Sequence, residues 1–434
     1  MIDIRKTVKT IVPTSLFKKI EPIGHLVESV VMNVRYGFPA KSMHIIGVTG
    51  TNGKTTTTSL IQKMLHEAGY KVGMFSTAAY GIGDDIKPEM AHITTAQAGI
   101  LQKRLREFKK AGVEWVVLET SSHSLSQYRT WGVPYEIAVM TNVTPDHLDY
   151  HETFDNYLDA KSRLFKLAAK NGHKFGIVNA DDPNADKFSK NIPNFVSYGL
   201  NGGDLKAEKI KLAADYSEYE VSIDKDKYNI HINIPGKFNI SNSLAAVAVG
   251  RELGLTKEQI EHGIAALTGV EGRMTVIDEG QQFKVIIDYA SSPDAFEKLF
   301  DSVRPATKGK LIAVFGSAGR RDEAKRAIQG KIAGKYSDEV ILTEEDDRDI
   351  DGNMILNQIA DGAKEAGKIK DKDMFLILDR KEAINFAVTR AKNADDTIVI
   401  LGKGHEKTIE RADGEHSWRE LEVTRKALRD LLKK

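Results

Sequence analysis

The chain has 434 residues with 62 basic and 61 acidic side chains, so its net charge is +1, and 41% of its residues are hydrophobic, as is ordinary for a globular protein. This length predicts about two to three domains, and the charge balance gives no global footprint for nucleic acid or an anionic membrane. The absence of cysteine excludes disulfides, thiolate metal sites and a cysteine nucleophile.

Residues 1–42 show little pattern beyond one short amphipathic helix over Leu26–Val34. The first twenty residues are polar and basic and lack the apolar core of a signal peptide. No run of about 18 apolar residues predicts a transmembrane helix. We therefore expect a cytoplasmic protein without membrane insertion, a monomer or weak oligomer.

From Met43 onward, short apolar runs alternate with helical stretches, which is typical of an α/β fold. The predicted strands of this part are His44–Val48, Val72–Ser76, Trp115–Glu119, Ile137–Thr141 and Phe175–Val178. Alternating residues then predict a β-rich hairpin of Tyr219–Ile223 and Tyr228–Ile234, followed by helices over Ser243–Leu253 and Lys257–Leu267.

A second α/β series follows, with a hinge predicted at Val270–Arg273. Its predicted strands are Lys284–Tyr289, Lys310–Phe315, Glu339–Thr343, Met374–Leu378 and Thr397–Leu401. We therefore expect a short segment at 1–42, a central domain at 43–273 and a C-terminal domain at 274–434.

A glycine-rich segment follows the first strand and opens a helix. It consists of Gly50, Thr51, Asn52, Gly53, Lys54, Thr55 and Thr56. The glycines let backbone N–H groups approach phosphate oxygens, and the helix N-terminus adds partial positive charge. Lys54 would bridge the terminal phosphates and Thr55 would bind Mg²⁺. A glycine turn with an incidental lysine is the alternative, which the strand–loop–helix context disfavours.

This segment and several later motifs resemble the Mur ligases of cell-wall synthesis. The further motifs are Thr94-Thr95, Glu119 to Leu125, Thr141-Asn142, Asp146 to His151, Ala160-Lys161, Asn179 to Asp182, Gly236 to Asn242, Gly272 to Met274, Asp288 to Ala290, Pro293-Asp294 and Gly402 to Glu406. The Ser-Ser-His block with Gln127 and Arg129 points to the branch that adds the third amino acid of the peptidoglycan stem.

The resemblance implies a central P-loop ATPase-type domain with a mostly parallel sheet, followed by a Rossmann-like C-terminal domain. It also implies an ATP-dependent ligase that forms an amide through an acyl-phosphate, using two Mg²⁺ ions. The ligands would be Thr55, Glu119, His147 and a carbamylated Lys161. By spacing alone, Lys161 is an ordinary solvent-facing lysine and a lone histidine is more often structural.

The resemblance assigns further residues to substrates. Asn239, Arg273 and Asp288 would bind ATP, although Asn239 is also a plausible helix N-cap. The donor would meet Thr94, Thr95, Ser121, Ser122, Gln127 and Arg129, and the acceptor would meet Arg321, Asp346, Arg348, Gly402 and Glu406. All partners would be small molecules, with no nucleic acid.

The expected acceptor is a diamino acid. Family members that add diaminopimelate carry Asp-Asn-Pro-Arg where this chain has Glu345-Asp346-Asp347-Arg348. Arg348 would clamp a carboxylate, and the acidic run Glu344–Asp351 would bind a second ammonium. A solvated acidic loop and a helix N-terminus preference remain open as alternatives.

Two departures from the family pattern bear on the substrate. Only a short segment precedes the phosphate loop, where typical members carry a UDP-binding domain, and Ser291-Ser292 stand where relatives have His-Thr. The alternatives are a ligase acting on a non-UDP substrate, like folylpolyglutamate synthetases or cyanophycin-type ligases, and a nucleotide-binding partner subunit of an amidotransferase.

Overall fold

The computed structural model describes residues 14–89, 94–213 and 215–433. The first part of the predicted segment 1–42 lies outside these ranges. Its predicted helix is confirmed as part of a longer helix, α2 (Thr14–Tyr36). Within the described ranges, no helix is both long enough and apolar enough to cross a membrane.

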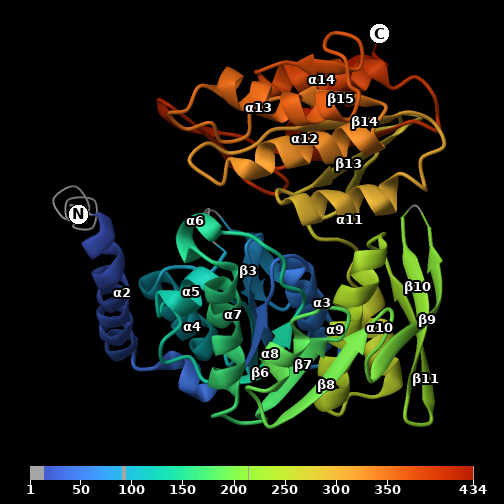
Figure 1. Ribbon diagram of the computed structural model, residues 1–434. Coiled ribbons are helices and arrows are strands. Elements are labelled where there is room, and N and C mark those ends of the chain that lie inside the picture. The colour runs from blue at the N-terminus through green and yellow to red at the C-terminus, as the bar shows by residue number, and fades with distance from the viewer. Residues whose placement is uncertain (1–13, 90–93, 214, 434) are drawn as a thin grey trace.

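A sheet of eleven strands forms the lower body of the molecule in Figure 1. Its order is β11-β10-β9-β8-β7-β6-β1-β5-β2-β3-β4. The strands are β1 (His44–Thr49), β2 (Val72–Phe75), β3 (Ala79–Ile82), β4 (Asp85–Pro88), β5 (Trp115–Glu119), β6 (Tyr135–Met140), β7 (Phe175–Asn179), β8 (Asn194–Gly199), β9 (Leu205–Leu212), β10 (Ser217–Ile223) and β11 (Asp226–Ile232). In this spatial order, every pair from β9 to β2 is parallel. The pairs at the two edges, β11-β10-β9 and β2-β3-β4, are antiparallel.

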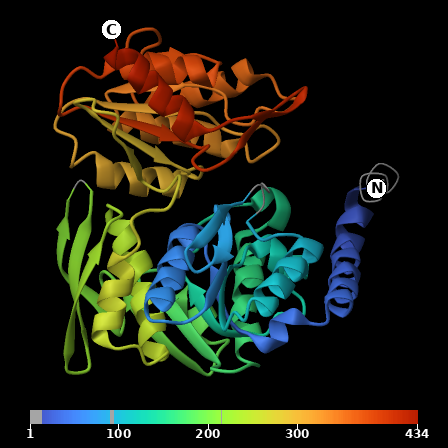
Figure 2. The ribbon, with the colours of Figure 1, turned by 180° about the vertical axis from the view of Figure 1, so that it is seen from behind.

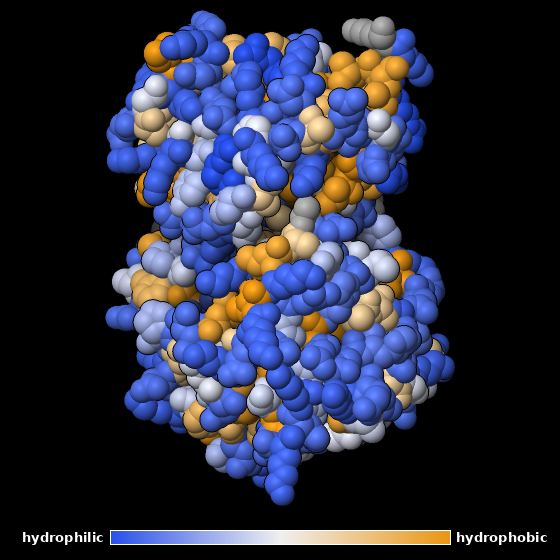
Figure 3. Space-filling view, turned by 90° about the vertical axis from the view of Figure 1, so that its right-hand side faces the viewer, coloured by the Kyte–Doolittle hydropathy of each residue, from blue (hydrophilic) through white to orange (hydrophobic). Residues whose placement is uncertain are grey.

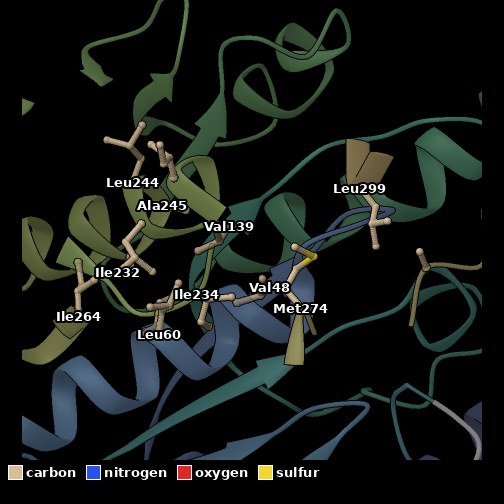
Figure 4. Close-up of a cluster of buried hydrophobic side chains, with 14 of the residues drawn as sticks. Val48, Leu60, Val139, Ile232, Ile234, Leu244, Ala245, Ile264, Met274 and Leu299 are labelled. Carbon is tan, nitrogen blue, oxygen red and sulfur yellow. The ribbon is translucent and has the colours of Figure 1, made fainter. Parts of the chain in front are cut away.

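Helices cover both faces of this sheet. They are η1 (Pro39–Ser42), α3 (Lys54–Glu67), α4 (Ala98–Lys110), α5 (Ser122–Ser126), α6 (Leu148–His151), α7 (Phe154–Ala168), α8 (Ala185–Ser189), α9 (Lys237–Glu252) and α10 (Lys257–Ala265). Alternate residues of β1 point to opposite cores, because Ile46 and Val48 join one buried cluster and Ile45 joins another. Figure 4 shows Val48 and Val139 of the sheet packed toward Leu60 of α3 and Leu244 of α9.

A second sheet of six strands forms the upper body, in the order β12-β13-β17-β14-β15-β16. Its strands are β12 (Thr275–Ile277), β13 (Lys284–Asp288), β14 (Leu311–Phe315), β15 (Glu339–Leu342), β16 (Met374–Leu376) and β17 (Thr397–Leu401). Around it lie α11 (Pro293–Val303), α12 (Ala324–Tyr336), α13 (Gly352–Glu365), α14 (Arg380–Arg390), α15 (Glu420–Leu432) and the hairpin β18 (Thr408–Arg411) and β19 (Gly414–Ser417). Within the six-stranded sheet, all strand pairs are parallel except β12 with β13.

The two bodies meet at a waist, which is visible in the space-filling view of Figure 3. The mixed α/β class, the parallel sheets and all ten predicted strands of the two α/β series are confirmed within a few residues. The predicted hairpin forms as β10 and β11, but it continues the large sheet through β9.

Candidate active site

A cavity of about 1000 Å³ lies between the two bodies. Its walls come from the end of β5 and the segments after β1, β2, β6, β7 and β8 of the lower sheet, and from the segments after β13, β14, β15 and β17 of the upper sheet. Crevices beyond the carboxyl ends of parallel strands are the usual ligand sites of open α/β sheets. The topology therefore brings segments that are far apart in sequence to one cleft.

The glycine-rich loop after β1 is held in place by the end of β6. The N–H of Thr51 donates to the Asn142 carbonyl at 2.7 Å, and the N–H of Asn52 donates to the Asn142 side chain at 3.0 Å. Gly53, at φ 83°, leads directly into α3, and a Cβ there would collide with Asn242. The loop is therefore fixed around backbone conformations that favour glycine.

Lys54 lies in the first turn of α3, and its Nζ donates to the Thr51 carbonyl at 2.8 Å. Burial lowers the pKa of this lysine below its ordinary value. The ammonium is thus folded against its own loop at the wall of the cavity. Of the predicted loop residues, Thr51 to Thr56 line the cavity and Gly50 does not.

Glu119 ends β5 beside the start of α3. The Thr55 hydroxyl donates to Glu119 Oε2 at 3.0 Å, and the N–H and hydroxyl of Thr77 donate to the same carboxylate at 2.8 Å each. Arg273 donates from Nη2 to the Thr55 hydroxyl at 3.1 Å. The arrangement brings together an alcohol and a carboxylate, which are hard oxygen ligands suited to Mg²⁺.

His147 and Lys161 lie on the other side of the loop. The His147 ring makes an edge contact with His123, and burial, then the positive charge of Lys161, lowers the pKa of His147 to about 3. The imidazole is therefore neutral at pH 7, as a metal ligand must be. His147 lines the cavity with Asp146, a residue that the sequence reasoning did not single out.

Lys161 is 2% exposed, against the solvent-facing position that its helical spacing suggested. It projects from α7 behind the loop, where its Nζ donates to the Gly50 carbonyl at 2.5 Å. Burial, reinforced by the charge of Lys54, lowers its pKa well below the ordinary value. A buried amine with a depressed pKa carries more of the neutral form, which is the nucleophile that reacts with CO₂.

Only Thr94 of the predicted donor residues lines the cavity. Behind it, the N–H of Ser121 donates to the Thr95 hydroxyl at 3.0 Å, and Arg129 donates to the Thr95 carbonyl at 3.2 Å. Ser122 and Gln127 are also buried, and Ser122 contacts His151. These side chains form a polar network that supports this wall.

The predicted nucleotide residues divide into two groups. Arg273 and Asp288 line the cavity, and burial raises the pKa of the Asp288 carboxyl, which accepts from the N–H groups of Met274 and Ala290. Asn239 is buried outside the cavity wall and donates to the Pro235 carbonyl at 2.8 Å. The neighbouring Asn242 lines the cavity instead.

Arg321, Asp346, Arg348 and Glu406 of the predicted acceptor residues line the upper wall. Lys403 is fully buried and pairs with both Asp346, at 2.8 Å, and Glu406. Arg348 pairs through Nε with Glu410 at 2.7 Å. Gly402 lies behind the wall, at φ 103°, where a Cβ would press on Glu345.

Comparisons with known proteins agree with this geometry. The model of the Mur ligase middle domain matches residues 48–250, and that of the Mur ligase, glutamate ligase domain matches residues 272–404. A UDP-N-acetylmuramyl-tripeptide synthetase of Roseiflexus sp. (strain RS-1) is 39% identical over 410 residues, which are 91% of this chain and 80% of that protein. This chain belongs to the Mur ligase family.

A further relative and two solved structures are similar to this chain over most of its length. A UDP-N-acetylmuramoyl-L-alanyl-D-glutamate–2,6-diaminopimelate ligase of Clostridium tetani is 37% identical over 401 residues, covering 91% of this chain and 80% of that protein. The solved structure of an enzyme of that name is 31% identical with a TM-score of 0.61, covering 90% of this chain and 79% of that one. The folylpolyglutamate synthase of Mycobacterium tuberculosis has a TM-score of 0.72 at 15% identity, covering 95% of this chain and 99% of that one, and this likeness shows a shared fold alone.

The roles of two residues beside the cavity walls of this Mur ligase were missed by the sequence reasoning. Lys403 was quoted only as part of a motif, and its role as partner of two acidic wall residues depends on tertiary contacts. Asp294 was also quoted as a motif residue, and its carboxylate accepts from the Asn52 side chain at 2.7 Å across the cleft. The glycine-rich spacing of 402–404 and the helix-opening Pro293-Asp294 were the available signals.

Proposed function

We propose that this Mur ligase uses ATP to join an amino acid to the carboxylate of a muramoyl-peptide donor in peptidoglycan precursor synthesis. The observation that carries the proposal is the convergence of Lys54, Thr55 and Glu119 on one cleft with a second, acidic wall opposite. The relatives named above, at 37–39% identity, are tripeptide synthetases or diaminopimelate ligases. The cleft supplies phosphate binding at one wall and a place for an amine at the other.

In this reaction a donor carboxylate oxygen attacks the γ-phosphorus of ATP, and ADP leaves. Lys54 would release the Thr51 carbonyl and bind the transferred phosphoryl oxygens, and the N–H groups at the start of α3 would face the same charge. The acceptor amine then attacks the acyl carbon of the acyl-phosphate, and phosphate leaves with the bonding pair. Arg273, which lies between the bodies and contacts Thr55, would hold them closed and exclude water.

The residues fit two Mg²⁺ sites. Thr55 and Glu119 would hold one ion, and neutral His147 with a carbamate on Lys161 would hold the other. Mg²⁺ supplies charge neutralisation of the phosphate oxygens. The support for the carbamate is the buried, pKa-depressed amine of Lys161. Protein supplied with ¹³C-bicarbonate should give a carbamate carbon signal that Lys161→Ala lacks, and its absence in the wild type would remove this assignment.

We further propose a diamino acid as acceptor. Glu410 and Glu415 add carboxylates to the wall that holds Asp346 and Glu406, so an ammonium beyond the reacting amine would find partners there. Lys403 already neutralises part of this charge. Arg348 would exchange Glu410 for the acceptor carboxylate.

Phosphate release is the direct test. Diaminopimelate, lysine, ornithine and glutamate are to be paired with muramoyl-dipeptide donors, with and without UDP. Phosphate should appear only when ATP, donor and acceptor are all present, and Lys54→Ala should lower kcat by about 100-fold or more. Phosphate release that ignores donor and acceptor would identify an ATPase and reject the ligase.

A further inference from the structure

A buried carboxylate on the upper wall of the cavity has no part in the reaction as described above. Glu345 follows β15, lines the cavity and is 8% exposed. Its carboxylate accepts no hydrogen bond and joins no ion pair with the residues that the structure describes. Burial of a carboxylate without a partner is costly. A group that the fold leaves in this state at a cavity wall is suited to a ligand that brings the missing partner.

The other buried carboxylates that line the cavity, within the described ranges, are already engaged by the protein. Each accepts hydrogen bonds from N–H or hydroxyl groups or pairs with a lysine; they are Glu119, Asp182, Asp288 and Asp346. A proton that arrived on one of these groups would break contacts that hold the cleft together. The Glu345 carboxylate can accept a proton without such a loss.

Glu345 lies on the side of the cavity from which an acceptor amine would approach the phosphates. The charge of Glu406, burial and then the charge of Glu345 raise the pKa of Tyr289. The Tyr289 ring centre lies 4.6 Å from the guanidinium of Arg273, which donates to Thr55 at the start of α3. Figures 1 and 2 show the upper body over the lower one from both sides, so that this wall faces the lower body.

The surroundings of the Glu345 carboxyl make it a stronger base than an exposed glutamate. Burial has the largest effect and raises its pKa, and Asp346 raises it too, whereas the positive charges of Lys325, Lys403 and Arg380 lower it. The net shift is upward. A carboxylate accepts a proton more effectively as its pKa approaches the operating pH.

The chemistry of the second half-reaction requires a base. The amine of an amino acid is protonated at pH 7, so it has no lone pair with which to attack. Transfer of one proton to a carboxylate turns an ammonium and a carboxylate into a neutral amine and a neutral acid. A buried site holds such neutral groups at less cost than an unpaired charge.

We propose that Glu345 is the general base of the ligase reaction, an assignment that rests on the proposed function. The Glu345 carboxylate takes one proton from the acceptor ammonium, and the neutral amine attacks the acyl carbon. The C–N bond forms as the bond from the acyl carbon to the phosphate oxygen breaks. Phosphate leaves with the bonding pair and takes the second proton from the nitrogen, and Glu345 then releases its proton to solvent.

Hydroxylamine separates proton removal from formation of the acyl-phosphate. It is uncharged at neutral pH and attacks an acyl-phosphate without a base, which gives a hydroxamate. The wild type with ATP, Mg²⁺ and a muramoyl-dipeptide donor should therefore form a hydroxamate with hydroxylamine and an amide with lysine or diaminopimelate. A wild type that forms neither product would reject the proposed function itself.

Glu345→Gln keeps the shape of the protonated side chain but cannot accept a proton. At saturating amino acid its kcat should fall by about 100-fold or more, while hydroxamate formation stays within about threefold of the wild type. The remaining amide formation should climb as pH rises, because the amine then loses its proton in solution. Glu345→Asp should recover part of kcat, and Glu297→Gln, at an exposed position on α11, should change neither product.

Three results for Glu345→Gln would overturn the assignment. Unchanged amide formation would show that no proton passes to this group. A raised KM for the amino acid with an unchanged kcat would show that Glu345 binds the acceptor without taking its proton. Loss of the hydroxamate together with the amide would place the effect at acyl-phosphate formation or at folding, since hydroxylamine needs no base.

Discussion

At the scale of single residues, the acidic run Glu344–Asp351 beside the cleft contains a carboxyl group whose burial lowers the stability of the fold at neutral pH. Burial, followed by the charge of Glu344, raises the pKa of Asp347 to about 6. Its Oδ1 is buried and accepts no hydrogen bond from a described residue. The folded state therefore binds this proton more tightly than the unfolded state does, and stability falls as pH rises from about 4 to about 6.

Asp347→Asn should remove the loss of stability that the wild type shows as pH rises. We expect the variant to match the wild type near pH 4 and to exceed its free energy of unfolding at pH 7 by about 1 kcal/mol, after a discount for partial solvent screening. Urea unfolding across this range gives the comparison. Asp349→Asn is the control, because Asp349 is exposed and paired with Arg320, so it should bring no gain. Equal pH profiles for Asp347→Asn and the wild type would contradict the argument.

At the scale of elements, α14 and α15 are joined by an ion pair in which neither side chain is exposed. The Arg380 guanidinium pairs with Glu420 and also donates to the Glu344 and Leu401 carbonyls, at 2.9 and 2.7 Å. Trp418 donates to the same Glu420 carboxylate at 2.7 Å. The guanidinium thus holds the carboxyl ends of β15 and β17, where the upper wall of the cavity, with the predicted acceptor residues, begins.

Glu420→Leu should leave that guanidinium buried without its counter-ion and cost about 3–5 kcal/mol of unfolding free energy. Arg380→Met/Glu420→Leu removes both charges and should cost less than the two single changes together. Denaturant unfolding of the four proteins measures the coupling. Strict additivity of the two changes would show that the pair is not coupled.

Elements with a clear pattern of apolar residues could be predicted from the sequence, whereas contacts between elements could not. Trp115–Glu119 and Thr397–Leu401 formed as predicted because continuous apolar runs specify buried parallel strands. Helix α9 begins at Lys237, before the predicted Ser243, because a segment rich in Asn and Gly resembles a loop locally and becomes helical when Ile240 packs in the core. Phosphate-loop spacing located most of the site, whereas the burial of Lys161 and the inward turn of Asn239 depend on neighbours distant in sequence.

At the scale of the whole molecule, hydrogen bonds between described residues tie the upper and lower bodies across the cleft. Asn52 of the phosphate loop donates to Asp294 of α11 at 2.7 Å, Arg273 donates to Thr55, and His405 contacts the Thr77 carbonyl at 3.2 Å. Burial lowers the pKa of His405 to about 3, so this contact carries no positive charge at pH 7. The bond from Asn52 to Asp294 joins a loop residue that precedes α3 directly to α11 of the opposite body.

Asp294→Ala should therefore shift the ligand-free protein toward open arrangements. A hydrogen bond to a charged group contributes about 1.5–3 kcal/mol, so the ratio of open to closed molecules should rise by about tenfold or more. Small-angle scattering should report a larger radius of gyration. The value of kcat should fall because the upper wall of the cavity lies close to the phosphate loop in a smaller fraction of the molecules. Glu297→Ala, an exposed position on the same helix, controls for loss of an α11 carboxylate. Unchanged scattering in Asp294→Ala would mean that Arg273 and His405 hold the bodies together without it.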